Sequence, residues 1–197
     1  MTIKLISITP DAERLIERAA RTCYGSELSK DYAVTQTFIR GLIKKGHESV
    51  LEHAVASFKV SGVSRALLAQ ITRHRHASFS VRSQRYTTGV GFVRDFPFLS
   101  RYPEAQEDID ELLDAIKAQY NTLIEYGMAP EDARMILPMC TTTEFVMTAN
   151  FREWRHIFKL RISSKAQKEV RDMCKEMMYI LEIHAPSVFN QNEYSEA

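Results

Sequence analysis

Residues 72–86 read Thr-Arg-His-Arg-His-Ala-Ser-Phe-Ser-Val-Arg-Ser-Gln-Arg-Tyr, and this stretch says more about the chain than any other. It holds four arginines, two histidines and three serines in fifteen residues, with no acidic residue among them. Arginine presents a planar fork of donors that matches phosphate oxygens, serine adds a hydroxyl donor, and histidine adds a donor that also transfers protons. The composition predicts an anion site, most naturally for phosphate, with a solvated basic loop as the alternative.

The rest of the chain indicates that this positive charge is local. The sequence has 197 residues, of which 45% are hydrophobic and 26% charged, and its formal net charge is +1. This length and composition predict a single globular domain over residues 1–197 with a sizeable core. Near-neutral charge favours a small anionic ligand over nucleic acid. A nucleic-acid-binding module, with Phe79 and Tyr86 as stacking groups on a basic loop, remains the alternative.

Cysteine usage and hydropathy indicate the compartment. Cys23, Cys140 and Cys174 are far apart, odd in number and form no CxxC pair, so we expect free thiols in a reducing environment. The first residues contain no apolar segment typical of a secretory signal, and no uncharged apolar run is long enough to span a bilayer. We therefore expect a soluble cytoplasmic protein with no membrane partner.

Hydrophobic periodicity predicts an α+β fold, with mixed helices around a central, mostly antiparallel sheet. Strands are predicted at residues 3–8, 86–93 and 141–149. A further strand is predicted from the alternation over residues 54–60, with its end at Gly62. Helices are predicted from Thr9-Pro10, at about 31–45, after Ser64, from Glu104 to Gly127, from Pro130, after Asn150, and behind a capping box of Ser164 and Gln167. Val34, Phe38 and Leu112 are among the side chains predicted to face inward. Residues 73–85 are predicted to form a loop, and residues 96–103 an irregular linker.

The order of residues in the basic stretch narrows the interpretation. Arg73-His74-Arg75 is followed after seven residues by Ser83, and Arg85-Tyr86 comes directly behind. This RHR-x7-S pattern resembles the signature of flavin-dependent thymidylate synthases. The resemblance extends from about residue 20 to residue 161 through four separated blocks. It implies a flavin-binding fold, and the lack of a GxGxxG fingerprint argues against the Rossmann type.

A second block, Gly46-His47-Glu48-Ser49 with Glu52-His53, resembles the family's GHxS/T segment. Taken alone, its two histidines invite a metal, but their spacing fits no common helical metal pair and HExxH is absent. Ordinary capping and surface hydrogen bonding is the plainer alternative. We expect no metal, although a metal-dependent phosphohydrolase that uses His47, His53, His74 and His76 remains a third hypothesis.

The two remaining blocks each contain arginines that have structural alternatives. Arg134 lies in an apolar Ala-Arg-x-x-Leu-Pro stretch, where a buried salt bridge would serve as well as a ligand contact. Asn150-x-Arg152, followed by His156 and Arg161, comes directly after a predicted strand. Arg161 alone is also compatible with a surface ion pair.

The resemblance implies the reductive methylation of dUMP to dTMP, with 5,10-methylenetetrahydrofolate as carbon donor and NADPH as reductant through bound FAD. The residues expected to contact FAD are His47, Ser49, Arg73, His74, Arg75, Val81, Asn150, Arg152 and His156. The residues expected to contact dUMP are Gln70, Arg73, Val81, Arg82, Ser83, Gln84, Arg85, Arg134 and Arg161.

The resemblance also assigns the chemistry and the assembly. Arg161 is expected to be catalytic, since a cation at the N3/O2 edge favours ionised uracil and makes its C5 a better nucleophile. Neither Ser83 nor any cysteine is expected to be a nucleophile. Val81 stands where many members carry an acid or amide, and His156 where others carry asparagine. A homotetramer with active sites shared between subunits is expected.

Overall fold

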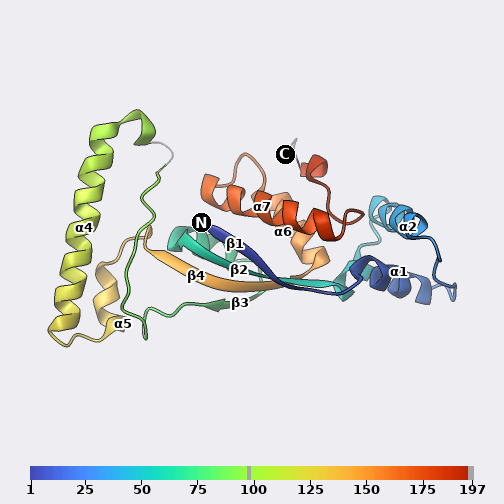
Figure 1. Ribbon diagram of the computed structural model, residues 1–197, viewed down its shortest axis with the longest axis horizontal. Coiled ribbons are helices and arrows are strands. Elements are labelled where there is room, and N and C mark those ends of the chain that lie inside the picture. Colours follow the sequence, from blue (N-terminus) through green and yellow to red (C-terminus); the bar gives the residue numbers. More distant parts are fainter. Residues whose placement is uncertain (97–98, 195–197) are drawn as a thin grey trace. The chain divides into compact units, whose positions relative to one another are not determined.

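The computed structural model describes residues 1–96 and 99–194. Its strands form one four-stranded antiparallel sheet in the order β1-β2-β4-β3 (Figure 1). The strands are β1 (Thr2–Ile8), β2 (Val55–Ser64), β3 (Ser78–Val81) and β4 (Thr142–Asn150). The α-helices are α1 (Ala12–Thr22), α2 (Tyr32–Lys44), α3 (Arg65–Ile71), α4 (Pro103–Glu125), α5 (Pro130–Ala133), α6 (Phe151–Arg161) and α7 (Lys168–His184). The α+β prediction is therefore confirmed.

The chain divides into two compact units. The first comprises Met1–Thr2, Val60–Ile71 and Ser80–Phe145, and the second comprises Ile3–Lys59, Thr72–Phe79 and Val146–Ala197. Strands β2, β3 and β4 each begin in one unit and end in the other. The basic stretch is divided as well, because the boundary falls between Phe79 and Ser80.

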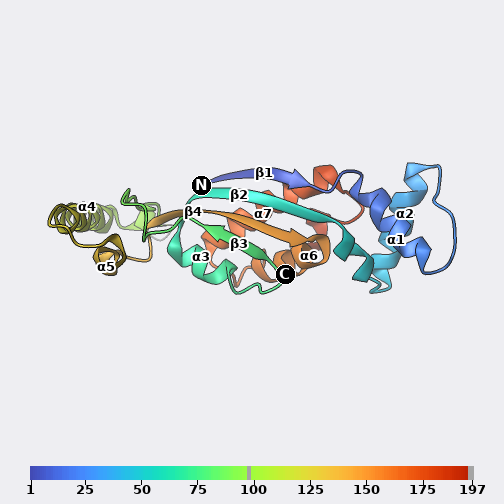
Figure 2. The ribbon, with the colours of Figure 1, turned by 90° about the horizontal axis from the view of Figure 1, so that it is seen from below.

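The second unit has its core where α6 packs on β2. Ala56 and Phe58 point inward from β2, as the period of two predicts, and both are buried. Trp154 of α6 donates its indole N–H to the carbonyl of Ala56 at 3.2 Å, and its ring meets Phe58 edge-on at 5.3 Å. Figures 1 and 2 show α6 and α7 together on this face of the strands. Burial of such aromatic side chains is what fixes α6 in place.

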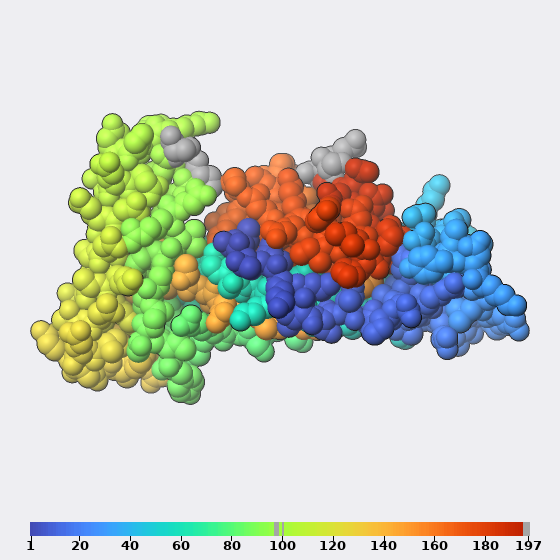
Figure 3. All heavy atoms as spheres, in the orientation of Figure 1, coloured from blue at the N-terminus to red at the C-terminus, as the bar shows by residue number. Residues whose placement is uncertain are grey.

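Helices α1 and α2 pack against each other in the same unit, as their adjoining blue atoms show in Figure 3. Between them lies Glu17, whose side chain is fully buried. It accepts hydrogen bonds from Arg21 at 2.6 Å and from Thr35 at 2.6 Å. Burial alone would raise the pKa of Glu17, but these hydrogen bonds outweigh it and lower the pKa below its usual value.

In the first unit, α4 packs against α5 and the 3₁₀ turn that follows it. Leu113 and Tyr120 are its buried residues, whereas Leu112 is 57% exposed, so the prediction that Leu112 faces inward is wrong. The apolar stripe of this 23-residue helix is narrower than its sequence indicates. Short 3₁₀ turns occupy Ser49–His53 (η1), Leu99–Arg101 (η2), Arg134–Ile136 (η3) and Gln191–Tyr194 (η4).

The prediction of a strand at residues 86–93 is wrong, and so is the prediction that residues 73–85 form only a loop. The fourth strand is β3, in which exposed serines alternate with the partly buried Phe79 and Val81. That alternation is the period of a strand, and the surrounding arginines obscured it. Residues 86–93 contain two glycines, and among them only Phe92 forms a bridge, with Thr141. Glycine weakens strands, which explains the missing ladder.

Several element boundaries and one inward face also differ from prediction. α1 begins at Ala12, because the Thr9 hydroxyl accepts from the backbone N–H of Val55 instead of capping the helix. The capping box of Ser164 and Gln167 is wrong, since α7 begins at Lys168 and Gln167 makes no side-chain cap. Strand β2 continues past Gly62 to Ser64, so the predicted end there is also wrong.

The inward face of α2 is made by Thr35, Ile39 and Leu42, whereas Val34 is 46% exposed. The prediction for Val34 is therefore wrong, since Thr35 turns inward to bond Glu17. Within the predicted linker 96–103, residues 97–98 lie outside the described part of the chain, and Leu99–Arg101 forms the turn η2.

Candidate active site

The Arg-His-Arg motif follows the end of helix α3 in the chain. The hydroxyl of Ser64 accepts from the backbone N–H of Leu67 at 3.0 Å, which caps the helix as predicted. The helix ends at Ile71, and the next three motif residues alternate in exposure. Arg73 and Arg75 are exposed, whereas His74 is only 6% exposed. The two arginines thus face solvent, and the histidine points into the second unit.

His74 joins two residues of α6 that stand far from it in the sequence. Its Nε2 accepts a hydrogen bond from Nε of Arg161 at 3.0 Å, across a separation of 87 residues. Its Nδ1 lies 3.4 Å from Oε1 of Glu153, which is also buried. The ring of His156 meets that of His74 edge-on, with centroids 6.0 Å apart. We name Glu153, His74 and Arg161 the relay triad.

The imidazole of His74 is neutral at neutral pH. Burial lowers its pKa to about 4, and the nearby Arg161 and His156 add to the effect. An arginine side chain only donates, so Nε2 of His74 must be the acceptor and Nδ1 must carry the proton. Because the imidazole is neutral, its 3.4 Å contact with Glu153 is not a salt bridge, and the protonated Nδ1 faces the Glu153 carboxyl oxygen.

A pocket of about 880 Å³ opens beside the triad in the second unit. It is lined by Glu48, Glu52, His76, Asn150, Arg152, Glu153, Arg155, His156, Lys159, Glu193 and Tyr194. Three of these, Asn150, Arg152 and His156, are expected FAD contacts that the start of α6 brings together. Asn150 is the N-cap of α6, and its Oδ1 accepts from the backbone N–H of Glu153 at 2.8 Å.

The donors of this pocket fit a phosphate-bearing ligand. Arg152 donates to Glu52 at 2.5 Å, but both side chains are about half exposed, so this ion pair contributes only about 0–1 kcal/mol. A phosphate oxygen can therefore replace the carboxylate at little cost. Arg155 differs, because it donates to the carbonyl of Val188 at 2.6 Å and holds the chain that follows α7. The N-terminus of α6 adds a favourable dipole for an anion.

His47 and Ser49 lie on either side of Glu48, which lines the pocket, but they do not line it themselves. Gly46 ends α2 with φ = 76°, a backbone conformation that glycine adopts without strain. The backbone N–H of His47 then donates to the carbonyl of Leu42 at 2.9 Å. Both His47 and Ser49 are exposed.

The residues expected to contact the nucleotide, apart from Arg73 and Arg161, belong to the first unit. Arg85 donates to a carboxylate oxygen of Glu131 at 2.7 Å, and Arg134 donates to the carbonyl of the same residue at 3.1 Å. Glu131 thereby holds two expected ligand arginines close together. The hydroxyl of Ser83 accepts from the backbone N–H of Arg85 at 3.2 Å, and Val81 and Gln70 are partly buried.

Arg65 is a candidate that the sequence interpretation missed. It lines a small pocket with Arg82 and Gln84, and no hydrogen-bond acceptor among the described residues reaches its buried Nη1. Burial lowers the pKa of Arg65, and the positive charge of Arg134 lowers it further. The two cations and the buried donor, which has no acceptor among the described residues, together favour the binding of an anion. The available signal was an arginine directly after the capping Ser64.

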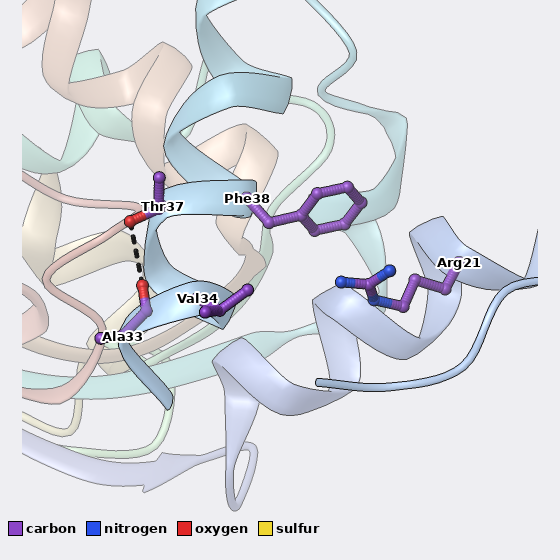
Figure 4. Close-up of a pocket in the computed structure, with 5 residues that line it drawn as sticks. All are labelled: Arg21, Ala33, Val34, Thr37 and Phe38. Carbon is purple, nitrogen blue, oxygen red and sulfur yellow. Dashed lines mark hydrogen bonds between the residues drawn. The ribbon is translucent and has the colours of Figure 1, made fainter. Parts of the chain in front are cut away.

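A further pocket of about 390 Å³ lies on α1 and α2 (Figure 4). The guanidinium of Arg21 stands 4.6 Å from the centre of the Phe38 ring, and Val34 lies alongside. Thr37 donates to the carbonyl of Ala33 in the drawn hydrogen bond. Arg21 is already bonded to Glu17, and no expected ligand residue lines this pocket. Val34, which points outward from α2, is part of its lining.

Cys174 is buried, and burial raises the pKa of its thiol to about 12, which fits the packing role predicted for it. Among residues 1–96 and 99–194, no three side chains of His, Cys, Asp or Glu are grouped to hold a metal ion. Within those same ranges, no helix is both long and apolar enough to cross a bilayer.

Comparisons with known proteins agree with the motifs. Residues 4–187 match the family described as thymidylate synthase complementing protein. The chain is 38% identical to a flavin-dependent thymidylate synthase of Geobacter sulfurreducens, over 96% of this chain and 85% of the relative. It is 34% identical to one from Haloarcula marismortui, over 98% and 95% respectively. A probable flavin-dependent thymidylate synthase of Mycobacterium phage L5 is 32% identical over 91% and 80%.

Proposed function

Because this chain belongs to the thymidylate synthase complementing protein family, and is an enzyme of dTMP synthesis that depends on a flavin, we propose which molecules it uses and which residues hold them. The substrate is dUMP, which is reductively methylated to dTMP. The carbon donor is 5,10-methylenetetrahydrofolate, the reductant is NADPH, and the flavin is FAD. The alternative of a nucleic-acid-binding module is not favoured, since both the relatives and the net charge of +1 speak against it.

One observation carries the assignment of the site. The histidine of the Arg-His-Arg motif is bonded at 3.0 Å to Arg161, the residue expected to polarise uracil. Two blocks that the resemblance assigns to one active site are 87 residues apart in the chain, yet their side chains touch. Packing alone does not require an arginine and a histidine at this point.

The proposed flavin contacts come from residues of the second unit. Arg152 and His156 would bind the phosphates and polar edges of FAD in the 880 Å³ pocket, with the N-terminus of α6 assisting. The exposed Arg73 and Arg75 would add positive charge from the motif. When bound, the flavin supplies hydride chemistry that none of these side chains can perform.

The proposed contacts with the phosphate of dUMP come from residues of the first unit. Arg65, Arg82 and Arg134 would bind the phosphate of dUMP, since Arg65 has a buried donor without a partner among the described residues. Glu131 holds Arg134 and Arg85 for this purpose. Arg161 would contact the N3/O2 edge of uracil and stabilise the negative charge that activates C5. The guanidinium of Arg161 supplies the positive charge for this contact.

We also propose that residues 1–197 act as one flavin-dependent thymidylate synthase domain in the cytoplasm, since the family match includes residues of both units. The working form would be a homotetramer in which different subunits complete each site. Light scattering with size exclusion tests this directly. A monomer that binds FAD tightly and turns over dUMP would contradict the tetramer.

The proposed reaction is tested with purified protein under anaerobic conditions. The visible spectrum is recorded, NADPH is added with and without dUMP, and dTMP is measured by chromatography after addition of methylenetetrahydrofolate. We expect a yellow protein that NADPH bleaches and dTMP that requires every component. Arg161→Lys, which keeps the charge but changes the donor geometry, should bind flavin normally and form dTMP far more slowly. A colourless protein that takes up no FAD would contradict the proposal.

A further inference from the structure

The relay triad contains a carboxylate that no sequence motif assigns. Glu153 is in the first turn of α6 and Arg161 is in the last, whereas His74 comes from the segment after α3. Side chains of an α-helix lean toward its N-terminus, so Arg161 extends back along α6 toward the turn that carries Glu153. His74 stands between them, with one ring nitrogen toward each.

We propose that Glu153 is a positioning residue, which acts through His74 to set the orientation of the Arg161 guanidinium. This inference rests on the proposed role of Arg161 toward uracil. The carboxylate stands 3.4 Å from Nδ1 and favours the tautomer with its proton on that nitrogen, which leaves Nε2 to accept from Nε–H of Arg161. The carboxylate thereby sets the tautomer, and the hydrogen bond at Nε2 sets the direction of the guanidinium, because a neutral imidazole has one donor and one acceptor on opposite sides.

The choice of Arg161 nitrogen suits this role. The bond to His74 uses Nε, whereas a planar contact with a pyrimidine edge uses the terminal Nη donors. Holding the guanidinium at Nε therefore sets its plane through a nitrogen other than the Nη donors that would face the substrate. An arginine side chain has several rotatable bonds, and fixing it before substrate binds reduces the freedom that binding must remove.

Burial explains why the relay needs a carboxylate. His74 and Glu153 are 6% and 8% exposed, so water has little access to either. Without the carboxylate 3.4 Å from Nδ1, the buried N–H would have no anion beside it, and the ring could rotate or change tautomer. A ring with its proton on Nε2 would direct a donor at the Nε–H of Arg161. The guanidinium would then leave its place, although its charge would be unchanged.

A double-mutant cycle separates positioning from general packing. The four proteins are the wild type, Glu153→Ala, Arg161→Ala and the double variant. The rate of dTMP formation from radiolabelled dUMP is divided by the amount of bound flavin, so that unfolded protein does not count. We expect Glu153→Ala to lower kcat about 10- to 100-fold, as a misplaced catalytic group does, with flavin binding and Tm close to wild type. In the Arg161→Ala background the same change should cost less than about twofold.

Two more variants define the chemical requirement. Glu153→Gln keeps a side-chain oxygen that can face Nδ1–H and should recover most of the rate. Glu153→Met fills the same space without an acceptor, and it replaces Glu153→Ala in the cycle if that variant folds poorly. The matched control is Asp172→Asn, which removes a carboxylate from a surface pair with Lys168 on α7 and should change nothing.

The outcomes distinguish this inference from the proposed function. If the wild type makes no dTMP, both fail. If the wild type is active but Glu153→Ala costs as much with Arg161 absent as with it present, only the positioning role fails. Equal losses in Glu153→Gln and Glu153→Ala, at wild-type Tm, would also overturn it. Non-additive losses with recovery in Glu153→Gln establish it.

Discussion

Two buried glutamates in the second unit organise polar clusters in opposite ways. Glu17, between α1 and α2, accepts hydrogen bonds from two arginines and a threonine and from the backbone N–H of Ser29. Each donor is directed at the same carboxylate, and the cluster is closed. One ring nitrogen of His74 faces Glu153, and the other accepts a hydrogen bond from Arg161. The difference indicates that the first cluster holds helices together, whereas the second transmits an orientation to a side chain.

The largest expected effect comes from the far end of the second cluster. Arg161→Ala should lower the rate of dTMP formation about 1000-fold, corresponding to roughly 4 kcal/mol, because it removes a charge that acts on the developing anion. Flavin absorbance and Tm should stay near wild-type values. Steady-state kinetics normalised to bound flavin measure this. A fall of less than tenfold would remove Arg161 from the catalytic role.

The first cluster should respond in stability and not in chemistry. Glu17→Ala should lower the free energy of unfolding by about 3 kcal/mol, since it leaves Arg14, Arg21 and Thr35 without their shared acceptor. Chemical denaturation gives the value. The rate per bound flavin should remain within about twofold of wild type. A variant of normal stability and low kcat would reverse the roles assigned to the two clusters.

As the pH falls, each of the two clusters should lose its contribution to the free energy of unfolding in a different pH range. The pKa of His74 is lowered from 6.5 to about 4, so the unfolded chain binds the extra proton first as pH falls. Stability is therefore lost between about pH 6.5 and 4, by roughly 3 kcal/mol at most. Glu17 also has a lowered pKa, but its contribution is complete above about pH 4.5 and is lost only below that value.

Denaturation curves at half-unit pH steps measure both windows. His74→Gln should remove the loss between pH 6.5 and 4, and Glu17→Gln should remove the loss below pH 4.5. The groups that face His74 from α6 are Glu153, His156 and Arg161, and Cys174 of α7 lies near Arg161. A loss above pH 5 that persists in His74→Gln would assign that window to another group.

The contrast between the two clusters also shows how much of the fold and of the site could be predicted from the sequence. Periodicity located β2, β4 and α6, because one face of each is buried and the pattern follows burial. The resemblance to the family identified His74 and Arg161 as candidates. It did not predict that they touch, since a contact across 87 residues depends on the packing of α6 on the sheet.

The residues that were missed share a physical reason. Glu153 and Arg65 look like ordinary charges at the start of a helix, where acids are common and a single arginine attracts no notice. Their importance comes from burial, because a buried donor or acceptor that lacks a partner has a large effect on the free energy of folding. Strand β3 was missed for a similar reason, because its arginine neighbours concealed a short alternation. Sequence patterns report the average burial of an element better than the burial of one polar atom.

The smallest expected effect concerns the exposed pair in the pocket. If Arg152 binds a phosphate of FAD, Arg152→Gln should weaken flavin affinity about tenfold, near 1.4 kcal/mol, with little change in Tm. Glu52→Gln is the matched control, since it removes the competing carboxylate and should leave affinity unchanged or higher. Flavin titration by fluorescence quenching measures both. Were the pair structural, like the cluster around Glu17, the two variants would lose affinity and Tm together. A loss of affinity in Arg152→Gln without a loss in Glu52→Gln places Arg152 on the ligand.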